Sequence, residues 1–263
     1  MKRALTIAGS DSGGGAGIQA DLKTFAAHGV FGMTAITAVT AQNTLGVTAV
    51  HSVPADIVIA QIEAVVSDIG VDAVKTGMLA TAAIVEAVAA AIVDLDLPQV
   101  VVDPVMVAKG GARLLDGDAV EAMKAELLKR ALLITPNVAE AEALTGLEVR
   151  TLKQARAAAR ALRAMGPAAV IVKGGHLEGD EAIDVLFDGH RVIELRGPRL
   201  QSASTHGTGC TFASAIAANL AHGRSLEEAA RRAKAYLTEA IRQAPGLGAG
   251  HGPVNHFWRT EAS

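Results

Sequence analysis

The sequence contains a single cysteine, Cys210, in 263 residues. One thiol cannot form an intrachain disulfide, a Cys-x-x-Cys redox pair or a cysteine-rich zinc site, so these three kinds of centre are excluded. Aromatic residues make up only 3% of the chain and the net charge is −3. Because there is neither a basic excess nor a set of aromatic stacking platforms, we expect no nucleic-acid partner. The lack of disulfides fits a reducing compartment, and we expect a cytoplasmic protein.

Long hydrophobic runs are also missing. The richest apolar segment, Ala82–Val93, is interrupted by Glu86, and no stretch reaches the roughly 18 residues typical of a membrane-spanning helix. The start of the chain, Met1-Lys2-Arg3, is similar to the start of a signal peptide, but the apolar run that follows is too short. We therefore expect a first strand at this place and no membrane partner.

Half of the residues are hydrophobic, and a chain of this length can bury one large core. We expect a single domain over residues 1–263. Short apolar runs predict strands over Ala4–Ala8, Met33–Val39, Ala73–Thr76, Gln99–Val102, Leu132–Thr135 and Ala168–Lys173. Segments of helical period lie between or after them, over Gly17–Ala27, Pro54–Asp68, Thr81–Leu95, Asp116–Arg130, Thr151–Met165, Gly209–Ala221 and Leu226–Gln243, with a hairpin over Ala182–Phe187 and Arg191–Leu195. This alternation predicts an α/β fold, in which a mostly parallel sheet has helices on both faces in a three-layer sandwich.

The most informative segment is the run of small residues from Ser204 to Thr211, which leads directly into the predicted helix Gly209–Ala221. The backbone N–H groups of Gly207, Gly209 and Cys210 would converge at a helix N-terminus, where the helix dipole favours an anion such as a phosphate. A tight turn, with glycines present only for close packing, remains the alternative.

Polar side chains follow several predicted strands, at the sheet edge where ligands bind in open α/β folds. Asp103 is placed to hold Mg²⁺ near phosphates through water. Asn137 and Glu140 lie three residues apart at a helix start, which also fits a capping box with no further function. Lys173 could contact phosphate or extend into solvent. An anion turn, carboxylates and a lysine together indicate phosphoryl transfer.

A glycine-rich loop, Gly9 to Gly17, follows the first strand. It has neither the GxGxxG spacing of a dinucleotide site nor a Walker A lysine, so neither motif is assigned. Asp11 and Asp21 in and after this loop could cap the helix, lie in solvent or bind a ligand.

Read together, these segments resemble the hydroxymethylpyrimidine/phosphomethylpyrimidine kinases of thiamine biosynthesis, which belong to the ribokinase-like superfamily. The resemblance extends nearly end to end. It rests on Ile7–Asp11, Gly14–Asp21, Thr40–Thr44, Lys75–Leu79, Asp103–Lys109, Thr135–Asn137, Lys173–His176, Thr205–Thr211 and the tail Gly250–Phe257. Two departures are Ser204, where many relatives have asparagine, and Thr76, where isoleucine is common.

The resemblance implies a pocket for an aminopyrimidine. Gln42 would hydrogen-bond the ring, since a side-chain amide both donates and accepts. Gly9, Asp21, Met78 and Val105 would bind the substrate in the same pocket.

At the nucleotide end, the resemblance implies ATP and Mg²⁺ as cofactors. Asn137, Thr208 and Lys173 would contact the nucleotide, and Asp103 and Glu140 would hold the metal. Lys173 would also act on the transferring phosphoryl group.

Cys210 would be the base that accepts the proton of the attacking hydroxyl, together with an anion turn of Gly207, Thr208 and Gly209. A thiol at a helix N-terminus is expected to have a lowered pKa, so that a thiolate could act near neutral pH. The family carries out two successive phosphorylations, of the alcohol and then of the monophosphate. Relatives also suggest a homodimer, and the apolar strand Val47–Val53 could form its interface or shield the substrate.

Three alternatives remain. Close relatives phosphorylate vitamin B6 compounds, so the chain could be a pyridoxal kinase. A cysteine-dependent hydrolase or transferase would use His206 to activate Cys210. A noncatalytic sensor would keep the pyrimidine pocket without turning over ATP.

Overall fold

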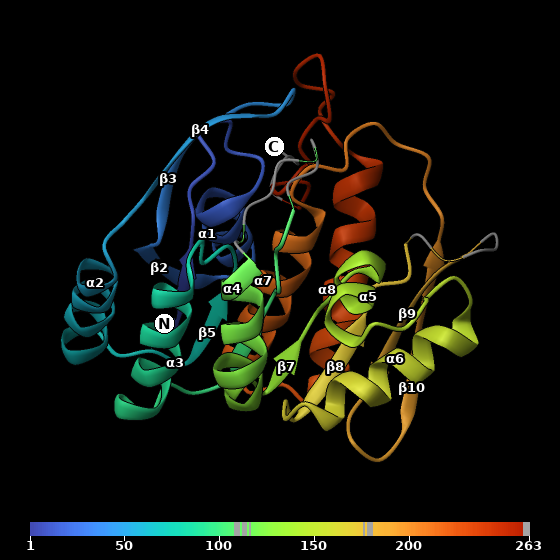
Figure 1. Cartoon of the computed structure of the whole chain (residues 1–263). Helices are drawn as coiled ribbons and strands as arrows, with labels where there is room; N and C mark the ends of the chain where they lie inside the picture. Colours follow the sequence, from blue (N-terminus) through green and yellow to red (C-terminus); the bar gives the residue numbers. More distant parts are fainter. Residues whose placement is uncertain (108–110, 112–114, 116, 176, 178–180, 260–263) are drawn as a thin grey trace.

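The core of the protein is an eight-stranded sheet with the order β10-β9-β8-β7-β6-β5-β1-β2 (Figure 1). The computed structural model describes residues 1–107, 111, 115, 117–175, 177 and 181–259. The strands of the sheet are β1 (Lys2–Ala8), β2 (Val30–Ile36), β5 (Ala73–Thr76), β6 (Val100–Val102), β7 (Leu133–Ile134), β8 (Ala169–Val172), β9 (Glu181–Phe187) and β10 (Val192–Pro198). Neighbouring strands from β8 to β2 in this order pair in parallel. The predicted hairpin β9–β10 forms one edge, where β9 runs antiparallel to both β8 and β10. A separate antiparallel ribbon consists of β3 (Ala38–Gln42) and β4 (Val47–Ser52).

Helices cover both faces of the sheet, as predicted (Figure 1). One face is packed by α1 (Gly17–Ala27), α7 (Thr208–Ala221) and α8 (Leu226–Arg242). The other is packed by α2 (Ala55–Asp68), α3 (Ala82–Asp94), α4 (Gly117–Ala122), α5 (Val138–Thr145) and α6 (Leu152–Ala164), with a π turn at Met123–Leu127 and a 3-10 turn at Leu128–Arg130. Asp116, the predicted start of the helix that ends at Arg130, lies outside the described residues. The fold is therefore a three-layer α/β sandwich, as predicted.

The predicted strand Met33–Val39 is wrong as a single element, because the chain leaves the sheet at Thr37. The N–H of Thr37 donates to Ala8 O (3.1 Å), and its hydroxyl donates to Met78 O (2.6 Å). These two bonds hold the backbone at the carboxyl ends of β1 and β5. Strand β3 then leads away from the sheet, and Gln42 at its end lies beside the carboxyl ends of the parallel strands.

Thr76 offers a test of how the sheet is packed. Its hydroxyl is buried and has no hydrogen-bond partner among the described residues. Burying a hydroxyl without a partner costs free energy, so we expect Thr76→Val to raise the free energy of unfolding by about 1 kcal/mol in urea titrations. Thr24→Val is the matched control, since that equally buried hydroxyl donates to Ala20 O (2.7 Å) and its loss should not stabilise. Destabilisation by Thr76→Val would contradict this account.

Among the described residues, no helix combines the length and the apolar character needed to cross a membrane.

Candidate active site

A cavity of about 610 Å³ opens at the carboxyl ends of the parallel strands. Residues that follow β1, β5, β6, β7 and β8 line it, as does the start of α7. All of the predicted site residues except Asp21 lie in its wall, namely Gly9, Gln42, Met78, Val105, Asp103, Asn137, Glu140, Lys173, Gly207, Thr208, Gly209 and Cys210. The topology thus gathers groups that are distant in sequence at one place.

The turn before α7 has the backbone expected of an anion site. Gly207 is the N-cap residue and adopts a left-handed conformation with φ of 76°. The hydroxyl of Thr208 donates to Thr205 O (3.1 Å), which closes the turn. A Cβ on Gly207 would overlap Gly15 O, so the turn is packed directly on the first glycine loop. The first N–H groups of α7 have no partner within the helix and are directed toward its N-terminus.

A half-buried lysine, Lys173, lies between two carboxylates beside the start of α7, because a Cβ added to Gly209 would lie 3.2 Å from Lys173 Nζ and 3.3 Å from Asp103 Oδ2. Lys173 Nζ lies 2.8 Å from Asp103 Oδ1 and 3.9 Å from Glu140 Oε2. Burial alone would lower the pKa of Lys173, but the charges of both carboxylates outweigh it and raise this pKa. The hydroxyl of Thr135 also donates to Asp103 (3.2 Å). Oxygen ligands from one or two carboxylates fit the way Mg²⁺ is held beside phosphates, with water completing its shell.

The capping interpretation of Asn137 and Glu140 is confirmed. Glu140 Oε2 accepts from Asn137 N (2.7 Å), and Asn137 Oδ1 accepts from Glu140 N (2.9 Å). Both residues also line the cavity, so the cap orients them toward it. Any contact that they make with a metal or nucleotide would be additional to this local role.

Glu140 should make stability depend on pH. Burial, reinforced by the charge of Asp103, raises the pKa of Glu140 from 4.5 to about 7, although Lys173 opposes this. Between these two values the folded protein binds the proton more tightly than the unfolded chain, so stability falls as pH rises. We expect Glu140→Gln to flatten the slope of unfolding free energy between pH 5 and 7 measured without Mg²⁺. The exposed Glu86→Gln serves as control, and an unchanged slope in Glu140→Gln would refute the assignment.

The predicted lowering of the Cys210 pKa is wrong. The thiol lines the cavity and is partly exposed there. Burial raises its pKa from 9.0 to about 11, and the charges of Asp21 and Asp103 add to this effect. Lys75 lowers the pKa but is already neutralised by Asp21, so it does not compensate for the burial.

Asp21, which we expected to bind substrate, is not among the residues that line the cavity. Its carboxylate is fully buried and accepts hydrogen bonds from Lys75 Nζ (2.9 Å), Thr6 Oγ1 (2.6 Å) and Ser214 Oγ (2.6 Å). Lys75 is buried as well, yet it reaches the cavity floor. The sequence patterns did not single out this lysine as a site residue. The available signal was its place within an apolar strand. A lysine there is buried, and a buried charge needs a partner of opposite charge.

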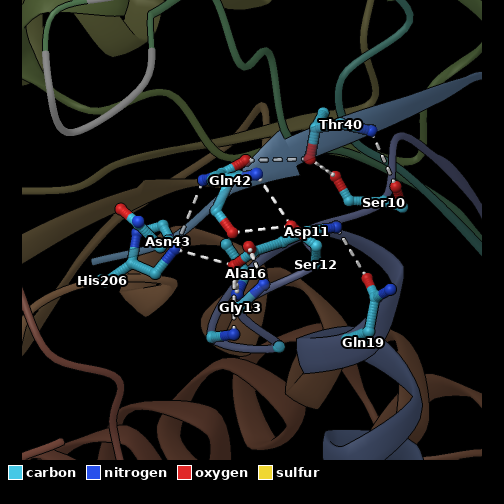
Figure 2. Close-up of polar contacts among 12 residues, drawn as sticks. Ser10, Asp11, Ser12, Gly13, Ala16, Gln19, Thr40, Gln42, Asn43 and His206 are labelled. Atoms are coloured by element: carbon cyan, nitrogen blue, oxygen red, sulfur yellow. Dashed lines mark hydrogen bonds and ion pairs between the residues drawn. The ribbon is translucent and has the colours of Figure 1, made fainter. Parts of the chain in front are cut away.

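The substrate end contains Gly9, Met78 and Gln42. Gly9 N donates to Met78 O (3.1 Å), and a Cβ on Gly9 would lie 3.1 Å from Met78 Sδ. Figure 2 shows that Gln42 faces His206, whose Nε2 lies 2.8 Å from Asp11 Oδ2. Among the described residues, the His206 ring makes polar contacts with Gln42 and Asp11 and none with Cys210. These contacts do not support the alternative in which His206 activates the Cys210 thiol as a nucleophile.

The sequence profile described as phosphomethylpyrimidine kinase matches residues 11–255. The chain belongs to this family. A Bacillus subtilis member, hydroxymethylpyrimidine/phosphomethylpyrimidine kinase, is 52% identical over 256 residues, which cover 97% of this chain and 94% of that protein. The bifunctional thiamine biosynthesis protein ThiED of Geobacter sulfurreducens is 54% identical over 257 residues; the match covers 98% of this chain but only 52% of that longer protein.

Solved structures of related enzymes have the same fold. Phosphomethylpyrimidine kinase of Clostridium difficile superposes with a TM-score of 0.82 at 43% identity, covering 92% of this chain and 100% of that one. Pyridoxal kinase of Staphylococcus aureus, in complex with AMP-PCP and pyridoxal, superposes with a TM-score of 0.92 at 38% identity, covering 100% and 96%. The chain is therefore similar in structure both to a phosphomethylpyrimidine kinase and to a pyridoxal kinase.

Proposed function

We propose that the protein transfers the γ-phosphoryl group of ATP to 4-amino-5-hydroxymethyl-2-methylpyrimidine and then to its monophosphate, which yields the pyrimidine pyrophosphate for thiamine biosynthesis. The family relationship supports this reaction. The observation that carries it is that the Lys173–carboxylate group, the anion turn at Gly207 and the amide of Gln42 all face one cavity.

The phosphoryl group would be stabilised by Lys173 and by the N–H groups that follow Gly207, since phosphoryl transfer depends on positioning and charge stabilisation. Asn137 and Thr208 would contact the nucleotide. Magnesium, when bound, neutralises part of the phosphate charge. Asp103 and Glu140 would hold the metal ion through water.

At the other end of the cavity, Gln42 would bind the aminopyrimidine, with Gly9, Met78 and Val105 around the ring. In its thiolate form Cys210 would act as the base. The substrate hydroxyl would then transfer its proton to the thiolate sulfur as the hydroxyl oxygen attacks the phosphorus atom and the bond from phosphorus to ADP breaks.

We also propose a cytoplasmic homodimer that forms through the β3–β4 ribbon. Val39 and Val50 of this ribbon are about half exposed, at 52% and 45%. Light scattering of the purified protein tests this assembly, and a monomer at micromolar concentration would refute it.

The test of the reaction is ATP consumption with Mg²⁺, with hydroxymethylpyrimidine, its monophosphate and pyridoxal offered separately and each product identified by mass. We expect turnover of both pyrimidines and little with pyridoxal. Turnover of pyridoxal alone would favour the second candidate, a pyridoxal kinase, for which the similarity to the Staphylococcus enzyme is the reason. No turnover of ATP with any of the three would favour a sensor.

A further inference from the structure

A buried carboxylate, that of Asp184, lies in the cavity wall beside the turn that follows β8. Its Oδ1 accepts a hydrogen bond from the N–H of Gly174 (2.8 Å), and its Oδ2 lies 2.8 Å from Lys234 Nζ. The side chains of Asp184 and Lys234 are only 7% and 13% exposed. A buried charge is costly unless it is paired, so each of these two groups needs the other. The reaction proposed for the cavity assigns no role to this pair.

The pairing of β8 with β9 ends next to Asp184. Its last paired residues are Val172 and Val185. One residue further along, the side chain of Asp184 takes the place of a strand carbonyl as the acceptor for the N–H of Gly174. Gly174 has no room for a side chain, because an added Cβ would overlap Ile183 O. The turn after β8 is thus held against β9 by close packing and by one side-chain hydrogen bond.

These contacts fix the backbone on the carboxyl side of Lys173. On the amino side, the N–H of Lys173 donates to Pro136 O (2.8 Å). From this backbone the side chain extends to Asp103 Oδ1 (2.8 Å) and to within 3.9 Å of Glu140 Oε2. Because the stem of a lysine is flexible, the position of its ammonium depends on a fixed backbone as well as on its partners.

Lys234 is held by its own surroundings. Its stem packs on β10, where a Cβ on Gly197 would lie 3.1 Å from Lys234 Cε, and its carbonyl oxygen accepts from Thr238 Oγ1 (2.8 Å). The lysine belongs to α8, which also provides Leu237 and Ile241 to the cavity wall. The ion pair therefore connects α8 to the backbone at the end of β8 (Figure 1).

We propose that Asp184, with Lys234 as its counter-ion, is a positioning residue for Lys173. By accepting the N–H of Gly174, it keeps the Lys173 ammonium where it stabilises the transferring phosphoryl group, and this inference therefore rests on the proposed function. The carboxylate acts as a hydrogen-bond acceptor, and the lysine neutralises it. A displacement of about 1 Å can lower the rate about 100-fold, so a hydrogen bond to the next residue is enough to affect turnover.

The test compares two paired variants that differ in one acceptor. Asp184→Asn/Lys234→Met and Asp184→Ala/Lys234→Met both remove the two buried charges, but only the asparagine keeps an oxygen for the N–H of Gly174. We expect the asparagine form to keep kcat within ~3-fold of the unaltered protein, and the alanine form to lose ~20-fold. The KM for the pyrimidine should change less than ~2-fold in both, because loss of a contact made in the transition state lowers kcat and leaves substrate binding intact.

A double-mutant cycle distinguishes positioning from a merely structural role. In a Lys173→Met background, the ~20-fold difference between the asparagine and alanine forms should fall below ~2-fold, because no ammonium remains to be positioned. Calorimetric titration with AMP-PCP repeats the cycle without turnover. The alanine form should bind this ligand ~5-fold more weakly than the asparagine form, and only where Lys173 is present.

Asp188→Ala is the matched control. Asp188 directly follows the other end of β9, where its carboxylate also accepts a backbone N–H, that of His190 (2.9 Å), and pairs with Arg191 (3.1 Å). Its loss should leave kcat unchanged. If urea titrations show that the alanine form does not fold, Asp184→Leu/Lys234→Met replaces it, because leucine fills the space of the carboxylate without providing an acceptor.

Equal kcat in the asparagine and alanine forms would overturn this inference alone. A difference that persists in the Lys173→Met background would do the same, because Asp184 would then act by another route. No phosphorylation of the pyrimidine by the unaltered protein would overturn the proposed function, and the inference with it.

Discussion

Gly207→Ala should lower kcat/KM at least ~100-fold, because it displaces the N–H groups that would face the transferring phosphoryl group. Gly207 combines a left-handed backbone with direct packing on Gly15 O. An added methyl group must separate the two glycine loops, and both form the cavity wall. Steady-state kinetics with ATP and the pyrimidine alcohol measures the loss.

The same helix provides the control. Gly223, just beyond the other end of α7, has φ of 79°, and a Cβ added there would have no atom of the described residues within 4 Å. Gly223→Ala therefore introduces the same backbone strain without the collision, and should cost about 1 kcal/mol of stability with normal activity. If both variants lose activity alike, backbone strain and not the anion turn would explain the effect of Gly207→Ala.

Cys210→Ser should slow the first phosphorylation by roughly 100-fold and the second by less than about fivefold. In the first step an alcohol must lose a proton, whereas in the second the attacking phosphate oxygen is already anionic. Since the pKa of the thiol is raised to about 11, little thiolate exists at neutral pH, and the first-step rate should increase with pH from about 7 to about 9.5.

Single-turnover measurements of each step, with products separated by mass, would resolve the two rates. The serine variant should lose the increase with pH, because a serine hydroxyl does not ionise in this range. Equal slowing of both steps, or a first-step rate independent of pH in the unaltered protein, would rule out the thiolate as base.

The order of strands and helices was predictable because apolar periodicity reports which face of each element is buried. Periodicity does not report where a strand leaves its sheet. Thr37 fits the pattern of Met33–Val39, and only its tertiary hydrogen bonds to Ala8 and Met78 show that the chain turns there.

The site could be predicted in its position but not in its electrostatics. Strand ends located Asp103 and Lys173 correctly, because parallel strands end at one sheet edge. The helix N-terminus suggested an acidic thiol at Cys210, but local rules omit the burial that raises its pKa. The ion pair of Asp21 could not be predicted from local patterns either, because its partner Lys75 is 54 residues away in the chain.

His206 joins the tail to the first glycine loop, because its N–H donates to Gly252 O (3.1 Å) and its Nε2 lies 2.8 Å from Asp11 Oδ2, and this has a consequence for synthesis of the chain. A ribosome that adds about 5–20 residues per second needs roughly 10–50 s to extend the nascent chain from the first of these glycine-loop residues to the tail. During that interval the loop around Asp11 has no imidazole to bind and is accessible to chaperones and proteases. The pyrimidine pocket is incomplete until the tail has emerged from the ribosome. Added substrate should therefore protect the finished protein from proteases, but not the partly synthesised chains.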